Sequence, residues 1–206
     1  MKITQLRNAT MVIHSGENVV LVDPMLAPKG AIPPLKYVRA KRRRNPLVDL
    51  PSETDAILQQ VTHCLITHCQ KGHFDHLDRA AAKWLRENNI PVYCSSQDAE
   101  FLSKKGLNVQ VLNVDTRNDF LNGTIDLVPC LHGEGFIGKF MAHGYGFVIR
   151  QTNEPSLYIT GDTILTQDVR NCIETEKPDW IVLPAGGARF DLGGDIIMGL
   201  EEALQV

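Results

Sequence analysis

Histidine and aspartate side chains cluster in one short stretch of the chain. Four of the seven histidines lie between residues 63 and 76, in the run HCLITHCQKGHFDHLD. Imidazole and carboxylate groups are the side chains that bind zinc and other divalent transition metals. Asp75 is adjacent to His76 and only two residues after His73, so the three residues together do not have the spacing of one helix face and suit a loop wrapped around metal. The stretch predicts a metal site that includes these three residues and His68, although a solvated loop with chance histidines is the alternative.

Two further candidate ligands lie downstream, each at the end of a β-rich run beside glycine. His132 follows VPCL, and Asp162 follows LYITG. Taken singly, His132 would more often be a loop or core histidine, and Asp162 a turn or helix-capping residue with Thr163 opening the next helix. Their occurrence in the same chain as the histidine cluster favours a role as metal ligands for both.

The segments around these residues alternate between strand and helix character. Residues 2–23 predict three short strands, with SGEN as the turn between the last two. Residues 63–67 are an apolar run typical of a buried strand, and residues 76–89 carry apolar side chains at the helical period. Asn122-Gly123 predicts a hairpin turn farther along, and residues 195–204 a final helix. The pattern indicates an α/β fold in which antiparallel sheets carry helices on their outer faces.

The amino-acid composition limits the classes to which the protein can belong. The 206 residues are 43% hydrophobic and 22% charged, which excludes a disordered or fibrous chain and suits one domain. A formal charge of −3 disfavours a generally basic nucleic-acid binder, and no apolar run approaches the ~20 residues of a membrane span. The N-terminus lacks a signal-peptide pattern, and the five cysteines form no C-x-x-C pair. We therefore expect a cytoplasmic protein with reduced thiols and no membrane partner.

The whole chain resembles the metallo-β-lactamase superfamily, with the motifs in the family's order. NATMVIHSGENVVLVDP resembles the first hairpin with its Asp-Pro, LITH…HFDHLD resembles the T-H-x-H-x-D-H signature, and ITGDT resembles the strand that carries a bridging aspartate. DWIVLPAGG is similar to the branch that includes L-ascorbate-6-phosphate lactonase. The resemblance implies an αβ/βα four-layer sandwich, built as a single domain over residues 1–206.

The resemblance also implies a metal-dependent hydrolase. A metal-bound hydroxide would cleave an ester, lactone or phosphodiester bond of a small-molecule substrate. Up to two divalent ions are implied, with zinc as the first choice and manganese or iron as alternatives. Asp75 would be the catalytic residue, since it would bind metal and also orient the hydroxide. The implied ligands are His68, His73 and His132 for the first ion, Asp75 and His76 for the second, and Asp162 as the bridge.

Two departures from the family pattern leave alternatives open. The family has one residue between its first two histidines, whereas CQKG separates His68 from His73. An ungapped register puts Gln70 and Gly72 where a histidine and an aspartate belong. The favoured register keeps HFDHLD intact. It puts Lys71 at the place of the first histidine, unless a longer loop, which costs little closure entropy, lets His68 fill that place. The chain also has no histidine after His143, where the superfamily usually supplies a last ligand. Either the family's C-terminal segment is missing from this sequence or the second ion lacks a ligand.

The partners of the protein are also open to alternatives. The basic run Arg39–Arg44 is either a solvated face or a patch that steers an anionic substrate. A metal-poor descendant of the fold would act as a binding protein, and a ribonuclease of the same superfamily would use the basic run for phosphates. The oligomeric state is not fixed by the sequence, and a homo-oligomer is one alternative.

Overall fold

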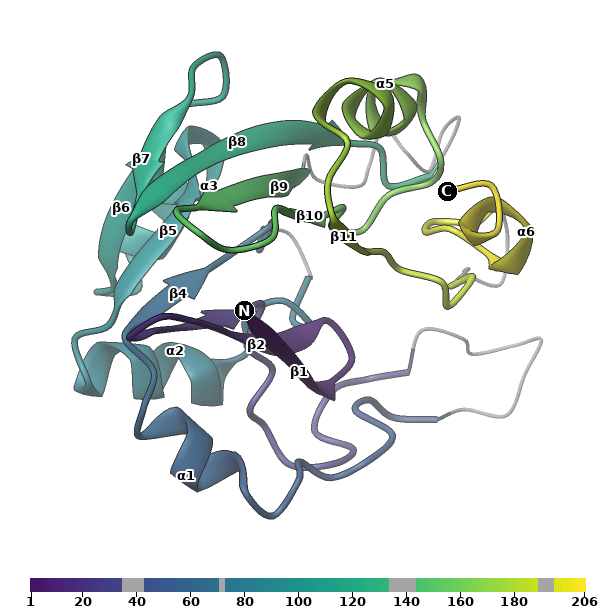
Figure 1. The fold of residues 1–206 in the computed structure, drawn as a ribbon. Helices are drawn as coiled ribbons and strands as arrows, with labels where there is room; N and C mark the ends of the chain where they lie inside the picture. Colours follow the sequence, from purple (N-terminus) through teal and green to yellow (C-terminus); the bar gives the residue numbers. More distant parts are fainter. Residues whose placement is uncertain (35–42, 71–72, 134–143, 189–194) are drawn as a thin grey trace. The chain divides into compact units, whose positions relative to one another are not determined.

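A computed structural model describes residues 1–34, 43–70, 73–133, 144–188 and 195–206 (Figure 1). These residues form two compact units, residues 1–112 and 113–206, and each unit has its own sheet. The single domain expected over residues 1–206 stays a prediction. No helix within the described ranges is long and apolar enough to cross a membrane.

The first unit is built on a six-stranded mixed sheet whose strands follow the chain order. Its first three strands pair antiparallel, and Ser15 pairs with Asn18, which confirms the predicted hairpin turn between the second and third strands. The last three strands continue the sheet in parallel. The strands are β1 (Lys2–Arg7), β2 (Thr10–Ser15), β3 (Asn18–Val22), β4 (His63–Leu65), β5 (Pro91–Ser95) and β6 (Asn108–Leu112).

Three helices belong to this unit: α1 (Thr54–Leu58), α2 (Arg79–Glu87) and α3 (Ser96–Ser103). Their apolar side chains join one row of strand residues in a single buried cluster, because Val12, Leu21, Cys64 and Val92 pair across four neighbouring strands. The next residues along β3 and β4 are buried as well. Strands buried on both faces read as continuous apolar runs, as in VVLV and CLI.

The second unit contains a five-stranded sheet in the order β11-β10-β9-β8-β7. Strands β7 to β10 pair antiparallel, and α5 (Gln167–Glu176) leads from β10 to β11, which pairs with β10 in parallel. Val148 and Tyr158 of the sheet pack with Val169 and Cys172 of α5 in a buried cluster. The other elements are β7 (Asn118–Phe120), β8 (Gly123–Cys130), β9 (Gly144–Gln151), β10 (Leu157–Ile159), β11 (Trp180–Val182) and α6 (Leu200–Ala203).

Several predicted boundaries are displaced in the structure, and one of them is the start of the final helix, which was expected at residue 195 and lies at Leu200 in α6. The helix expected over 76–89 begins only at Arg79, because Asp78 acts as its N-cap and accepts from the N–H of Ala81 at 2.8 Å. The hairpin turn expected at Asn122-Gly123 lies one residue earlier: Phe120 pairs with Gly123, and Leu121 takes the positive φ of 54°. Gly123 is instead needed as the first strand residue, since a Cβ there would lie 1.9 Å from the carbonyl oxygen of Arg150.

The five cysteines are all free thiols, as expected from their scattered positions. Cys64, Cys69, Cys94 and Cys172 are buried. Burial is the main cause that raises the pKa of each of these four thiols, to about 12 for Cys94 and about 11 for Cys172. Neighbouring acidic side chains add to each rise. The folded protein therefore keeps these protons at alkaline pH.

We expect the free energy of unfolding to fall as the pH rises from about 9 to about 11. Below the ordinary thiol pKa of about 8.5 both states hold the protons, whereas above it only the unfolded chain releases them, which favours unfolding. Urea unfolding at about pH 8 and about pH 10.5 measures the effect, and Cys94→Ala should make the pH dependence shallower. Equal urea midpoints for the wild type at the two pH values would contradict the prediction.

Candidate metal centre

Three imidazole rings of the first unit lie against one another. His68, His73 and His76 are buried, and one ligand nitrogen from each lies within 4.8 Å of the others. Nε2 of His68 is 3.1 Å from Nδ1 of His73, and the ring centroids of His68 and His76 are 3.9 Å apart. Donor nitrogens at this spacing can converge on one cation with small side-chain adjustments.

The end of β4 and the start of α2 supply these rings. β4 pairs in parallel with a strand on each side, and His68 follows shortly after its carboxyl end. At the other end of the segment, Asp78 caps α2 through Oδ1 and accepts from the N–H of Ala27 through Oδ2 at 2.6 Å. The ligand-bearing segment is thus anchored on both sides, and His76 lies in the turn before the helix.

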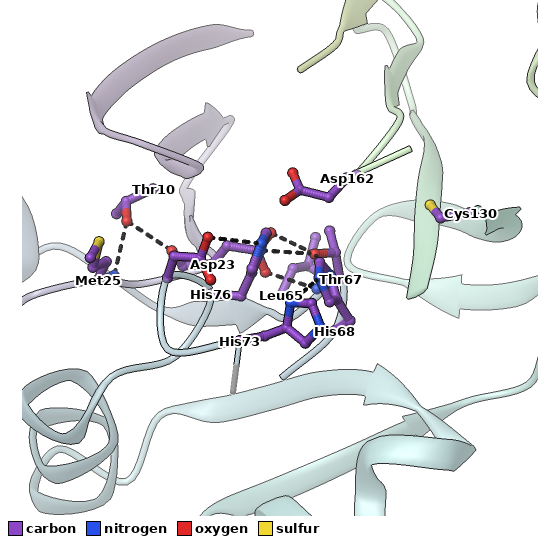
Figure 2. A network of polar contacts seen from close by, with 12 residues as sticks. Thr10, Asp23, Met25, Leu65, Thr67, His68, His73, His76, Cys130 and Asp162 are labelled. Atoms are coloured by element: carbon purple, nitrogen blue, oxygen red, sulfur yellow. Dashed lines mark hydrogen bonds and ion pairs between the residues drawn. The ribbon is translucent and has the colours of Figure 1, made fainter. Parts of the chain in front are cut away.

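A buried carboxylate supports this cluster from the end of β3. Figure 2 shows the side chain of Asp23 directed at Thr67 and His76. Its Oδ1 accepts from the N–H of Thr67 at 2.8 Å, and its Oδ2 accepts from the Thr67 hydroxyl at 2.7 Å and lies 2.9 Å from Nδ1 of His76. The hydroxyl of Thr10 donates to the carbonyl of Asp23 at 2.8 Å and accepts from the N–H of Met25 at 2.9 Å. The carboxylate is therefore fixed through its side chain and its backbone.

Asp75 differs from the histidines in its exposure. Its side chain is 46% exposed, and Oδ2 lies 3.9 Å from Nε2 of His76. A half-exposed carboxylate next to a buried imidazole can bind an ion and also reach water. The preceding residue, Phe74, is 54% exposed, so an aromatic surface lies beside this carboxylate in the sequence.

The second unit brings His132 and Asp162 together. They follow β8 and β10, two strands of one sheet, and Nε2 of His132 lies 3.7 Å from Oδ2 of Asp162. Nδ1 of His132 is 2.7 Å from the carbonyl oxygen of Ile196. A carbonyl only accepts, so Nδ1 carries the proton and Nε2 keeps its lone pair for a ligand.

Asp162 is not the cap of the following helix. The N-cap of α5 is Thr166, whose hydroxyl accepts from the N–H of Val169 at 3.3 Å. Thr163, the residue expected to open that helix, instead accepts from the N–H of Leu131 at 3.1 Å. The capping alternative is wrong, whereas the alternative of a turn residue stays open.

Other polar residues near the cluster have structural contacts. The side-chain amide of Gln70 donates to the carbonyl of Gln97. The thiol of Cys69 donates to Oδ1 of Asp98 at 3.6 Å, and burial, together with this carboxylate, raises its pKa far above the ordinary value. In the described part of the chain, Cys69 also belongs to none of the groups of ligand atoms that lie within 4.8 Å of one another.

The basic run is only partly within the described residues. Arg39–Arg42 lie outside them, as does His143. The guanidinium of Arg44 donates to the carbonyl oxygens of Gly30 at 2.6 Å and Ala31 at 3.0 Å. Arg44 therefore stabilises the loop to which it belongs. Substrate steering by the basic run Arg39–Arg44 stays a prediction.

Asp23 and Thr67 were not predicted as partners of the histidines. A signal was present, because VDP and LIT are the ends of two consecutive apolar runs. Such runs become neighbours when parallel strands pair, and Val22 indeed pairs with Leu65. Their carboxyl ends then lie side by side, which places Asp23 next to Thr67.

The donor set fits a divalent transition metal. Imidazole nitrogens and carboxylate oxygens are the ligands that zinc, iron and manganese accept. Ligating histidines usually direct their second ring nitrogen to a carboxylate, carbonyl or similar partner, and His76 and His132 both do so. The residues within each unit therefore suit a metal site on chemical grounds.

Fold and donor set together define an α/β protein whose histidine and aspartate side chains suit a divalent metal ion. Residues 2–206 match the family described as "Beta-lactamase superfamily domain", and the chain belongs to the metallo-β-lactamase superfamily. The UPF0173 protein YddR of Bacillus subtilis (strain 168) is 36% identical to it over 212 residues, which cover 100% of this chain and 80% of that protein. A UPF0173 metal-dependent hydrolase of Alkaliphilus metalliredigens is 28% identical over 193 residues, with coverage of 91% and 74%.

Solved structures resemble the chain over nearly its whole length. The isothiocyanate hydrolase from Delia radicum gut bacteria matches with a TM-score of 0.87 and 33% identity, covering 100% of this chain and 79% of that one. A possible metal-dependent hydrolase from Veillonella parvula matches with a TM-score of 0.86 and 27% identity, covering 98% and 79%. The predicted metallo-β-lactamase-like α/β fold and the predicted hydrolase class are confirmed. The lactonase-like branch stays a prediction.

Proposed function

We propose that the protein hydrolyses a small electrophilic molecule at a centre of up to two divalent metal ions. The observation that carries the proposal is the buried cluster of His68, His73 and His76, in a chain similar throughout to metal-dependent hydrolases. Superfamily membership supports a shared role for the ligands of both units. The proposed ligands are His68, His73, Asp75, His76, His132 and Asp162.

The proposed roles of these residues are to bind the metal ions and to orient the attacking water. A divalent ion held by such ligands supplies Lewis acidity and makes water a nucleophile near neutral pH. Asp75, half exposed beside His76, both binds and accepts a hydrogen bond from the attacking water, which aligns the water with the substrate. Asp162 supplies negative charge that offsets the repulsion between two cations. Zinc is the first choice of metal, with manganese and iron as alternatives.

For the substrate we propose an organic isothiocyanate. The similarity at 33% identity over the whole chain to an isothiocyanate hydrolase supports this class over the ester, lactone and phosphodiester alternatives. Water adds to the electrophilic central carbon of the N=C=S group, and the adduct releases an amine and carbonyl sulfide. The exposed aromatic ring of Phe74, between two proposed ligands, suits an apolar substituent on such a substrate.

Metal analysis and a substrate panel test the proposal. The protein is purified without chelator, its metal content is measured, and anomalous scattering from crystals locates and identifies each ion. The panel contains phenethyl isothiocyanate, an aryl ester, a lactone and a phosphodiester. Metal-dependent release of amine from the isothiocyanate is expected. A stable metal-free protein with no activity would instead favour the binding-protein alternative.

Phe74→Ala is expected to raise the KM for phenethyl isothiocyanate about 10-fold and to change the KM for methyl isothiocyanate much less. Loss of an aromatic contact removes about 1–2 kcal/mol of ground-state binding, whereas the metal ligands are untouched. Steady-state kinetics with both substrates checks the difference, and Phe74→Tyr is the matched control because it keeps the ring. Equal changes in KM for both substrates would count against a contact with the substituent.

A further inference from the structure

We infer that Asp23 is a positioning residue that sets the tautomers of two histidines, His76 directly and His68 through the hydroxyl of Thr67. The inference rests on the proposed metal role of these histidines. It concerns which ring nitrogen carries the proton, and therefore which nitrogen is available to a metal. All four side chains belong to the first unit and are buried.

The contact with His76 determines the first tautomer. An ionised carboxylate has no proton to donate, so it acts only as an acceptor. Nδ1 of His76, at 2.9 Å from Oδ2 of Asp23, must therefore carry the ring proton. The lone pair of the neutral ring then lies on Nε2, the nitrogen that is 3.9 Å from the carboxylate of Asp75.

The hydroxyl of Thr67 imposes the same tautomer on His68. A hydroxyl has a single proton, and that of Thr67 is donated to Oδ2 of Asp23 at 2.7 Å. Towards Nδ1 of His68, at 3.1 Å, the same oxygen can only accept. His68 is therefore also protonated at Nδ1, with its lone pair on Nε2. One carboxylate thus presents Nε2 of two rings as the ligating atom.

The backbone at Asp23 helps to hold this arrangement in place. Asp23 has φ of 45°, in the left-handed region that costs energy for residues other than glycine. Such a conformation persists only where the surroundings determine it, and here Thr10 holds it through hydrogen bonds to the carbonyl of Asp23 and the N–H of Met25. The strained position aims the carboxylate at Thr67 and His76 (Figure 2).

Asp23→Asn reverses donor and acceptor in these hydrogen bonds, with almost no change in the shape of the side chain. The N–H of Thr67 needs an acceptor, so the amide oxygen takes the place of Oδ1, and the amide NH₂ faces the Thr67 hydroxyl and Nδ1 of His76. His76 must then accept at Nδ1 and carry its proton on Nε2. The Thr67 hydroxyl accepts from the amide and donates to Nδ1 of His68, which at 3.1 Å is nearer to it than Nδ1 of His76 at 3.3 Å. This shifts the second ring in the same way.

Nitrogen-15 NMR of the metal-free protein at about pH 8 reads the two tautomers. The wild type should show Nδ1–H for both rings, Asp23→Asn should show Nε2–H for both, and Thr67→Val should change His68 while His76 keeps its form. Asp78→Asn is the matched control: this buried carboxylate accepts only from backbone N–H groups among its described contacts, so the variant should lose stability but keep both tautomers. Titration with Zn²⁺ should show an affinity loss of about 10–100-fold for Asp23→Asn, as for other partners of ligating histidines.

The outcomes separate this inference from the proposed function. Unchanged tautomers of both rings in Asp23→Asn would overturn the inference, whatever the metal affinity. A wild type that binds no Zn²⁺ would overturn the proposed metal centre, and the tautomers in the metal-free protein would still decide the role of Asp23. Changed tautomers with reduced Zn²⁺ affinity support both.

Discussion

His73→Ala is expected to lower the affinity for divalent metal by about 100-fold or more, and to remove activity with it. The substitution deletes one of three buried imidazoles whose nitrogens lie within 4.8 Å of one another. A 100-fold loss corresponds to about 2.7 kcal/mol, a reasonable amount for one ligand of a metal site. Competitive titration of Zn²⁺ against a chelator, with metal content per chain after dialysis, measures the effect.

Gln70→Ala is the control for this experiment, because the ungapped register puts a ligand at that position. The amide of Gln70 donates to the carbonyl of Gln97, a contact that involves exposed groups and stabilises little. We expect unchanged metal content and nearly unchanged activity. Loss of metal in Gln70→Ala together with retention in His73→Ala would reverse the choice of register.

The parts of the site that could be predicted are those that depend on local sequence. His68, His73 and His76 lie within nine residues, in the segment between the end of β4 and the start of α2. Whatever the fold, such a short segment keeps its side chains close, so residue type and density were sufficient to propose ligands. His132 and Asp162 required more, namely two strands of one sheet, β8 and β10, that lie on either side of β9, and the resemblance to a known family supplied that knowledge.

The parts that could not be predicted depend on contacts between distant segments. Asp23 reaches Thr67 across 44 positions of the chain, and only the pairing of β3 with β4 brings them together. The start of α2 was placed too early for a similar reason. Asp78 becomes the cap because its second oxygen is fixed by the N–H of Ala27, a contact that helical periodicity does not report.

Asp162→Asn is expected to leave the fold intact, reduce the metal bound per chain and lower activity by about 100-fold or more, a loss of roughly 2.7 kcal/mol of transition-state stabilisation. Asparagine is nearly isosteric with aspartate but lacks the charge that offsets the repulsion between two cations. The side chain is only 18% exposed, so solvent replaces little of the missing charge. Metal content, activity and melting temperature of the variant are the measurements.

Asp168→Asn provides a matched control in the same unit. Asp168 is exposed in the first turn of α5, so the change removes the same charge away from the proposed ligands. It should cost a few tenths of a kcal/mol through the helix dipole and leave the metal content unchanged. The cap of α5 is Thr166, so an effect of Asp162→Asn cannot be attributed to helix capping. If the Asp162 variant kept its full metal content and activity, the bridging role would be wrong, and with it the strongest reason to assign two ions to this hydrolase.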